Sequence, residues 1–285
     1  MLCNPQRRNL DAALVASLRN AWGGGDVVWL APDIAAEFMV ADVPANQWDV
    51  WQDCQALAVD LVVQQAQGRR KKMLLADMDS TLIQQECVDE LAIEAGVGQQ
   101  VAEITAQAMN AELEFEAALR ARVGLLKGLN ASVITKVLAE RITYMPGGKA
   151  LVATMKRNGA YAALVSGGFT AFTSAVADNL GFDEHRANTL LQQGGVLTGE
   201  VAEPILGREA KVMALEEISS RLGISETDVI AVGDGANDLG MLARAGTGVA
   251  LHAKPVVAAQ CDVRINFGDL TALLYLQGYS SDEFA

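Results

Sequence analysis

Two aspartates stand two residues apart at the end of an apolar run, where they could act together on one substrate. The run Met73 to Ala76 is followed directly by Asp77, and Asp79 comes two residues later in the string DMDSTLI. Residues i and i+2 of an extended strand point the same way, so both carboxylates can face the space beyond the strand. Close carboxylates repel unless a cation neutralises them or one holds a proton. One could therefore bind a metal ion and attack phosphorus while the other transfers the proton, although two surface aspartates at a strand end are also common.

A third candidate carboxylate lies in the string GDGAND, residues 233–238, which follows the apolar run Val229 to Val232. Asp234 is well placed to complete an oxygen-only magnesium site. Asn237 and Asp238 open the next predicted helix, and for each of them a capping role and a ligand role are equally open. The sequence therefore predicts a magnesium site built from two strand ends.

Two further segments could hold a phosphate group. Ser166, Gly167 and Gly168 follow the apolar run Tyr161 to Val165, and a hydroxyl with bare backbone amides at a helix N-terminus binds phosphate well. Lys211, near the start of a helical pattern, would neutralise phosphate oxygens. Taken singly, a Ser-Gly-Gly turn and a surface lysine are ordinary features.

The elements that must position these residues are short apolar strands that alternate with helical patterns. The predicted helices around the second and third strands are Gly148 to Asn158, Phe169 to Leu180, Arg208 to Leu222 and Asn237 to Ala245. Strands alternating with helices indicate a doubly wound α/β fold with a parallel sheet. Ligands of such sheets sit beyond the carboxyl ends of the strands, where all three polar clusters lie.

An insertion after the first strand breaks this alternation. It reads as four helices punctuated by glycines, namely Glu86 to Ala95, Gln99 to Met109, Leu113 to Leu126 and Ser132 to Arg141. A crossover between parallel strands does not need four helices, so a helical cap over the strand ends is favoured over a plain part of the helical layer. We expect residues 84–144 to form this cap, inserted in a catalytic core of residues 71–83 and 145–280.

Residues 1–70 form a small N-terminal accessory segment with no visible chemistry. It is predicted to hold a strand over Val27 to Leu30 and a helix over Asn46 to Gln65. The basic cluster Arg69 to Lys72 is interpreted as a solvated linker rather than a nucleic-acid patch. At the other end, the tail from Ser280 to Ala285 is expected to fray.

Composition excludes several function classes. The 285 residues are 51% hydrophobic with a net charge of −13, which disfavours binding to nucleic acid and to anionic membranes. The uncharged stretch 158–177 is interrupted by Ser166, Gly167 and Gly168, so it is not interpreted as a membrane span. No secretory signal is visible, and the four scattered cysteines suit reduced thiols in the cytoplasm.

The order of these motifs resembles a known family. Asp-x-Asp, then Ser-Gly-Gly, then Lys, then Gly-Asp-Gly-x-Asn-Asp is the ordered motif set of the haloacid dehalogenase (HAD) superfamily of phosphatases. A true dehalogenase would lack the second aspartate, so Asp79 favours phosphate chemistry. Within this superfamily, ADMDSTLIQQECVDELA, EITAQAMNAELEFEAALRARVGLLKGL, ALVSGGFT and VAVGDGANDLGML resemble the bacterial phosphoserine phosphatases from residue 73 to about residue 278.

The resemblance implies a complete set of roles. Asp77 would be the nucleophile and Asp79 the general acid and base. Mg2+ would be held by Asp77, the backbone carbonyl of Asp79, and Asp234. The phosphoryl group would bind Ser166, Gly167 and Lys211, and the amino acid end of O-phosphoserine would meet Glu86, Arg122 and Asn237 beneath Met109 and Phe115.

Two rival interpretations stay open at this stage. The chain could act on another small phosphate ester, such as phosphothreonine or phosphohomoserine, because pocket volume is not readable from sequence. It could also be a metal- or phosphate-binding regulatory protein without turnover, although binding alone would not require Asp79. Regulation by a bound amino acid is in doubt because residues 1–70 are short, and the oligomeric state, monomer or homodimer, is left open.

Overall fold

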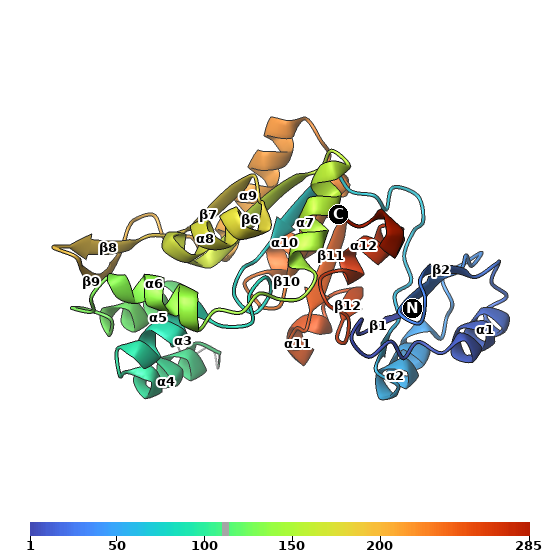
Figure 1. The fold of residues 1–285 in the computed structure, drawn as a ribbon, viewed down its shortest axis with the longest axis horizontal. Helices are drawn as coiled ribbons and strands as arrows, with labels where there is room; N and C mark the ends of the chain where they lie inside the picture. Colours follow the sequence, from blue (N-terminus) through green and yellow to red (C-terminus); the bar gives the residue numbers. More distant parts are fainter. Residues whose placement is uncertain (110–113) are drawn as a thin grey trace.

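A six-stranded parallel sheet forms the centre of the molecule (Figure 1). The computed structural model describes residues 1–109 and 114–285, apart from the side chains of residues 108 and 109. The strand order is β12-β11-β10-β5-β6-β7, and every neighbouring pair is parallel. The strands are β5 (Met73–Ala76), β6 (Tyr161–Phe169), β7 (Glu184–Asn188), β10 (Val229–Gly233), β11 (Thr247–Leu251) and β12 (Val263–Ile265). The predicted doubly wound α/β fold is confirmed.

Helices cover both faces of this sheet, and the burial of β5 shows why. Leu74 and Ala76 belong to the hydrophobic core on one face, whereas Met73 and Leu75 belong to the core on the other. On the first face lie α7 (Gly148–Arg157), α8 (Thr170–Leu180) and α12 (Ala272–Leu276). On the second lie α9 (Arg208–Leu222) and α10 (Leu239–Arg244), while α11 (Pro255–Ala258) precedes β12. A strand buried on both faces needs no polar alternation, which is why β5 reads as a continuous apolar run.

The insertion after β5 is helical, as predicted. Its helices are α3 (Cys87–Glu94), α4 (Gly98–Met109), α5 (Phe115–Gly124) and α6 (Ser132–Glu140), and they lie together at one end of the molecule (Figure 1). The predicted start at Leu113 lies outside the described residues. The two connections to the core run side by side, because Ile83 bridges Tyr144 and the Gln84 amide donates to the Thr143 carbonyl at 2.9 Å.

A hairpin of the core reaches toward the same helices. It consists of β8 (Leu190–Gln193) and β9 (Val196–Val201), which are antiparallel. Gly194 and Gly195 form its turn with φ of 61° and 80°, a backbone conformation that favours glycine. The hairpin contacts the insertion through Leu197, whose amide donates to the Leu129 carbonyl at 2.8 Å.

The N-terminal residues form a second, smaller sheet with its own hydrophobic core. The elements are β1 (Leu2–Cys3), α1 (Ala12–Ala21), β2 (Val28–Ala31), β3 (Ala35–Glu37), α2 (Gln47–Ala56) and β4 (Val59–Asp60), with strand order β2-β3-β1-β4. The strand predicted from Val27 begins one residue later. The helix predicted to run to Gln65 was wrong, because it ends at Ala56. Ala58 takes a left-handed φ of 56°, and the next two residues pair with β1.

Two expectations about the chain's exposed segments were also wrong. The basic cluster is not a free linker: Arg69 pairs with Glu37 at 2.5 Å, and Arg70 pairs with Glu283 at 3.0 Å. The C-terminal tail does not fray, because Ser281–Glu283 forms a 3-10 turn (η2) and the Ala285 amide donates to Thr154 Oγ1 at 2.8 Å.

A second short 3-10 turn, η1 (Glu226–Asp228), precedes β10. Among the described residues, no helix is long and apolar enough to cross a membrane.

Candidate active site

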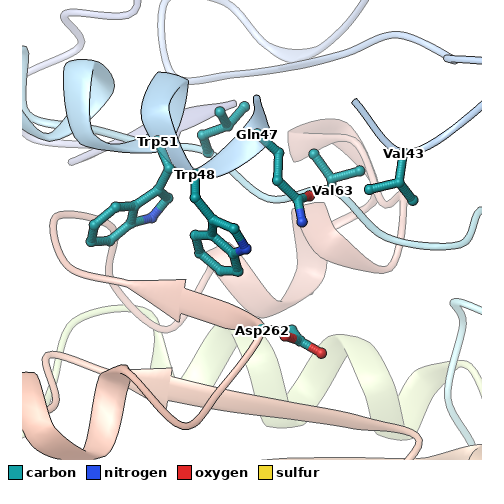
Figure 2. A pocket seen from close by; sticks show the side chains of 7 residues that line it. Val43, Gln47, Trp48, Trp51, Val63 and Asp262 are labelled. Atoms are coloured by element: carbon teal, nitrogen blue, oxygen red, sulfur yellow. The ribbon is translucent and has the colours of Figure 1, made fainter. Parts of the chain in front are cut away.

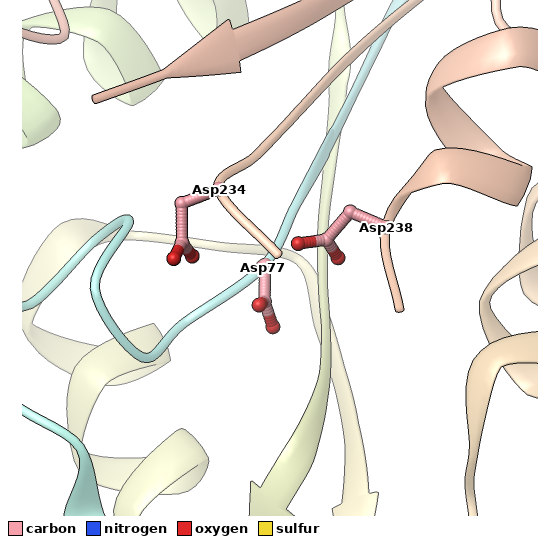
Figure 3. Close-up of side chains that lie close together, drawn as sticks. All are labelled: Asp77, Asp234 and Asp238. Carbon is pink, nitrogen blue, oxygen red and sulfur yellow. The ribbon is translucent and has the colours of Figure 1, made fainter. Parts of the chain in front are cut away.

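Three carboxylates meet at the carboxyl edge of the central sheet. Asp77 follows β5 directly, while Asp234 and Asp238 come from the loop between β10 and α10. Because β5 and β10 are adjacent parallel strands, their ends coincide. One oxygen from each carboxylate lies within 4.8 Å of the others. Figure 3 shows the three side chains close together. The structure thus brings together Asp77 and Asp234 of the predicted metal set and adds Asp238.

Lys211, which belongs to α9, offsets part of the negative charge of this cluster. Its ammonium nitrogen lies 2.7 Å from Asp77 Oδ1 and 2.5 Å from Asp238 Oδ1, and the side chain is 2% exposed. Burial lowers the pKa of Lys211, but the charges of Asp238 and Asp77 outweigh burial, so the pKa lies above its ordinary value. Burial and the charge of Asp238 raise the pKa of Asp77, while Lys211 opposes them. The lysine is therefore a fixed positive charge beside the predicted nucleophile.

Asp238 is a functional residue that sequence reasoning left undecided. It precedes α10, yet its side chain makes no capping hydrogen bond to that helix. Instead Oδ1 accepts from Lys211 Nζ and Oδ2 accepts from the Gly235 amide at 3.0 Å. The only sequence signal was its place in GDGAND, where capping and ligand roles were equally open.

Asp79 lies beside the Ser-Gly-Gly turn. A Cβ added to Gly168 would lie 3.0 Å from Asp79 Oδ2 and 3.1 Å from Ser166 Oγ, so the carboxylate and the hydroxyl border the same small space. Burial and the charge of Glu86 raise the pKa of Asp79 to about 7, while hydrogen bonds from Cys87 oppose the rise. A carboxyl with this pKa can be a proton donor or a proton acceptor near neutral pH.

The Ser-Gly-Gly turn has the shape expected of a phosphate-binding segment. Ser166 is 2% exposed, and its Oγ accepts a hydrogen bond from the Gly168 amide at 2.9 Å. This bond folds the backbone at the end of β6, so that the turn leads directly into α8. The hydroxyl proton of Ser166 is left available for a ligand oxygen.

The predicted substrate residues gather on the insertion side of these carboxylates. Glu86 accepts a hydrogen bond from Ser80 Oγ at 2.7 Å. Burial lowers the pKa of Arg122, while the nearby charges of Asp89, Glu86 and Asp79 oppose this shift. The Arg122 guanidinium therefore lies in the field of Glu86 and Asp79, and its Nε donates to the Ala118 carbonyl at 3.3 Å.

The other predicted contacts fall on both sides of the site. Asn237 folds back over the loop after β10, because a Cβ added to Gly235 would lie 2.3 Å from Asn237 Oδ1. Phe115 is half-buried, and a Cβ added to Gly167 would lie 3.3 Å from its Cζ atom. The side chain of Met109 lies outside the described part of the structure.

The donor set fits a hard divalent cation. Asp77 Oδ1 is a buried oxygen that lies against the Lys211 ammonium, and Asp79 Oδ1 is a buried oxygen without a hydrogen-bond partner among the described residues. Asp234 Oδ1 accepts from Thr81 Oγ1 at 3.2 Å. Burial, and then the charge of Asp238, raise the pKa of Asp234 to about 7. Buried carboxylates with raised pKa values, without a thiolate or imidazole in the group, match the oxygen ligands of Mg2+.

Two cavities lie away from this cluster. One of about 200 Å3 lies between α2 and Asp262 next to β12, and Figure 2 shows Trp48 and Trp51 on its wall. The other has a volume of about 440 Å3 and is lined by residues that include Arg7, Gln84 and the loop after β12. Neither is lined by any of the carboxylates above, so we assign the chemistry to the edge of the central sheet.

Comparison with known proteins places the chain among phosphatases. A sequence model of the haloacid dehalogenase-like hydrolases matches residues 74–243. A phosphoserine phosphatase of Streptomyces coelicolor is 40% identical over 290 residues, which cover 99% of this chain and 70% of that protein.

Solved structures agree. A HAD family hydrolase of Salmonella enterica serovar Typhi superimposes with a TM-score of 0.85 at 31% identity, covering 95% of this chain and 94% of its own. A phosphoserine phosphatase described as a phospho-aspartyl intermediate analogue superimposes with a TM-score of 0.68 at 41% identity, covering 72% of this chain and 98% of its own.

Proposed function

Because the chain belongs to the haloacid dehalogenase-like hydrolases, we propose that its buried carboxylate cluster hydrolyses O-phospho-L-serine to L-serine and phosphate. The observation that carries this proposal is the pair Asp77 and Lys211, whose side chains lie 2.7 Å apart at the end of β5 with Asp79 two residues on. The reaction is the last step of serine biosynthesis. The chain is a phosphoric monoester hydrolase that works through a phospho-aspartate.

The first half-reaction transfers the phosphoryl group to Asp77. A carboxylate oxygen of Asp77 forms a bond to phosphorus as the bond from phosphorus to the serine oxygen breaks. Asp79 donates its proton to that leaving oxygen, which its pKa of about 7 permits near neutral pH. Lys211, Ser166 and Gly167 hold the phosphoryl oxygens, so catalysis rests on positioning and charge stabilisation.

The second half-reaction regenerates the enzyme. Asp79, now a carboxylate, removes a proton from a water molecule as that water attacks phosphorus. The bond between phosphorus and Asp77 breaks, inorganic phosphate leaves, and Asp79 is again protonated. Asp79 thus serves first as the acid and then as the base. A pKa of about 7 allows both roles, because the protonated and the ionised carboxyl are both populated near neutral pH.

We assign Mg2+ to Asp77, the backbone carbonyl of Asp79, and Asp234. The support is the group of close carboxylates that contains Asp77 and Asp234. Bound there, Mg2+ would neutralise phosphoryl oxygens and hold them in line with Asp77. Asp238 is left out of this set because both of its oxygens already have partners, Oδ1 the Lys211 ammonium and Oδ2 the Gly235 amide.

The amino acid end of the substrate is assigned to the insertion. Arg122 would fork the two carboxylate oxygens of phosphoserine, and Glu86 would pair with its ammonium group. Asn237 would complete these contacts, with Met109 and Phe115 covering the pocket.

The chain then divides into three parts. Residues 84–144 act as a cap, residues 71–83 and 145–280 as the catalytic core, and residues 1–70 as an accessory domain. The four cysteines, all buried and unpaired, suit the cytoplasm.

Phosphate release tests the proposal. Purified protein is assayed on L-phosphoserine and on a panel that includes phosphothreonine and phosphohomoserine, with Mg2+ and with chelator. Asp77→Asn is the blank. We expect Mg2+-dependent release that is strongest on phosphoserine and absent in the variant. Turnover by the variant would contradict the phospho-aspartate, and stronger release from another ester would contradict the roles of Glu86 and Arg122.

A further inference from the structure

Asn188 is a buried polar residue that the proposed reaction does not use. It ends β7, is 2% exposed, and makes three hydrogen bonds with its side-chain amide. Nδ2 donates to the Gly167 carbonyl at 2.9 Å and to the Leu206 carbonyl at 3.2 Å. Oδ1 accepts from the Leu206 amide at 2.7 Å. One side chain therefore ties together two backbone segments that lie far apart in the sequence.

Both tied segments carry parts of the active site. Gly167 belongs to the Ser-Gly-Gly turn within the last residues of β6, which is assigned to the phosphoryl group. Leu206 and Gly207 lead directly into α9, which begins at Arg208 and carries Lys211. A change in the distance between these segments would therefore move the turn relative to the lysine.

The same two segments flank one aromatic ring of the insertion. A Cβ added to Gly207 would lie 3.3 Å from Phe115 Cδ1 and 3.5 Å from Cε1. A Cβ added to Gly167 would lie 3.3 Å from Phe115 Cζ and 3.7 Å from Cε2. The two glycines thus approach different atoms of the same ring, and a Cβ at either position would require the ring to shift by a few tenths of an ångström.

We propose that Asn188 is a positioning residue that holds Gly167 and Gly207 at the spacing needed to seat Phe115 against the phosphate-binding turn. Gly207 is the second wall of this seat. This role deepens the proposed function, because the ring seated there covers the phosphoryl group while Asp77 attacks. Asn188 itself touches no reacting atom and acts through the two backbone segments.

The proposed packing of Phe115 against Gly167 and Gly207 predicts a non-additive effect that a purely structural role of these residues does not. Gly207 has a φ of −105°, which alanine adopts readily, so Gly207→Ala changes only the space beside the ring. Gly207→Ala should lower kcat/KM on phosphoserine on the order of tenfold by displacing Phe115. Phe115→Leu alone should lower it as well. In the double variant the smaller side chain fits the narrower seat, so the two losses should be less than additive.

Asn188 is tested by two substitutions. Asn188→Ala removes all three hydrogen bonds, whereas Asn188→Asp keeps the acceptor for the Leu206 amide and loses both donated bonds. Both should lower kcat/KM on the order of tenfold or more. Hydrogen–deuterium exchange of α5, measured with Mg2+ and inorganic phosphate, should become faster in both. The controls are Asn158→Ala, in which an exposed residue loses one part-buried hydrogen bond to the Thr154 carbonyl, and Gly25→Ala, where an added Cβ would make only ordinary contacts.

The outcomes separate this proposal from the proposed function. Exchange in α5 does not depend on turnover, so the seat is measurable even if wild-type protein fails to hydrolyse phosphoserine. Strictly additive effects of Gly207→Ala and Phe115→Leu would overturn the seat. So would a folded Asn188→Ala protein with wild-type kcat/KM and wild-type exchange in α5. If Asn188→Ala does not fold, Asn188→Asp decides the role of Asn188, and wild-type kcat/KM with wild-type exchange in α5 would overturn it; the Gly207 and Phe115 cycle decides the seat.

Discussion

Lys211 and Asp238 form a buried ion pair, 2.5 Å apart, in which the aspartate oxygens are shared between the lysine and the backbone of the loop after β10. The same lysine lies 2.7 Å from Asp77. Asp238 therefore holds the ammonium group beside Asp77, the proposed nucleophile.

Removing the carboxylate of Asp238 should weaken both folding and catalysis. Asp238→Asn leaves Lys211 with Asp77 as its remaining partner, so we expect the unfolding free energy to fall by about 3 kcal/mol, at the low end for a broken buried pair. We expect kcat to fall more than tenfold, because the ammonium group loses its anchor. Urea unfolding and steady-state kinetics measure the two effects.

A matched control exists on the surface. Arg244 also pairs with two carboxylates, Glu216 and Glu226, but Arg244 is 51% exposed. Glu216→Gln should change the unfolding free energy by less than about 1 kcal/mol. Equal effects of Asp238→Asn and Glu216→Gln would show that burial does not strengthen the Lys211 pair.

Stability should depend on pH and on Mg2+ together. Burial, followed by the charges of Glu86 for Asp79 and of Asp238 for Asp234, raises the pKa of each from 3.8 to about 7. Between these values the metal-free folded protein binds more protons than the unfolded chain, so its stability should fall as pH rises from about 4 to about 7. Thermal unfolding with chelator across this range measures the effect.

Mg2+ competes with the proton of Asp234, so its stabilising effect should be larger at pH 8 than at pH 5. At a hundred times its dissociation constant it should add about 2.7 kcal/mol. Asp234→Asn should flatten the pH dependence and reduce the shift caused by Mg2+. A Mg2+-induced shift in Tm that is the same at both pH values would argue against binding at these carboxylates.

Gly168 should be required for activity because it has no side chain. A Cβ there would lie 3.0 Å from Asp79 Oδ2 and 3.1 Å from Ser166 Oγ, so Gly168→Ala pushes the general acid away from the leaving oxygen. We expect kcat to fall on the order of a hundredfold while the protein stays folded. Gly124→Ala is the control, because nothing lies within 4 Å of a Cβ at that helical position and activity should be unchanged. Near-wild-type kcat in Gly168→Ala would show that Asp79 has room to adjust.

The sequence predicted the strands that carry the nucleophile because these strands are buried on both faces. Met73 to Ala76 and Val229 to Val232 read as unbroken apolar runs, and parallel pairing then places Asp77 beside the GDGAND loop. Lys211 was identified from the order of the motifs, because no local pattern around it separates it from a surface lysine. The family resemblance, rather than periodicity, drew attention to Glu86 and Arg122.

Other features depend on contacts that no local pattern encodes. Asn188 belongs to no motif, and its partners Gly167 and Leu206 are far from it in the chain. The strand β4 was missed because the residues before it continue a helical pattern, and only the left-handed Ala58 and pairing with β1 end the helix. The tail from Ser280 is polar and short, yet Glu283 pairs with Arg70 and holds it.

Asp60 should anchor the N-terminal sheet to the core. It is fully buried, and its two oxygens accept hydrogen bonds from the amides of Asn266, Phe267 and Gly268 in the loop after β12. Asp60→Ala leaves these amides without their partner, and a buried unsatisfied group costs about 1–3 kcal/mol. We therefore expect the unfolding free energy to fall by at least about 3 kcal/mol in urea.

Activity separates this anchor from the active site. Strand β11 separates β12, whose following loop Asp60 holds, from the β10 loop of the carboxylate cluster. We therefore expect kcat/KM of folded Asp60→Ala protein at 25 °C to stay within about twofold of wild type. Asp26→Ala, at an exposed position of the same N-terminal region, should change stability by less than about 0.5 kcal/mol. An unchanged urea midpoint in Asp60→Ala would mean that the two sheets are held together by their apolar contacts, such as that of Leu2 with Gly268, rather than by the carboxylate.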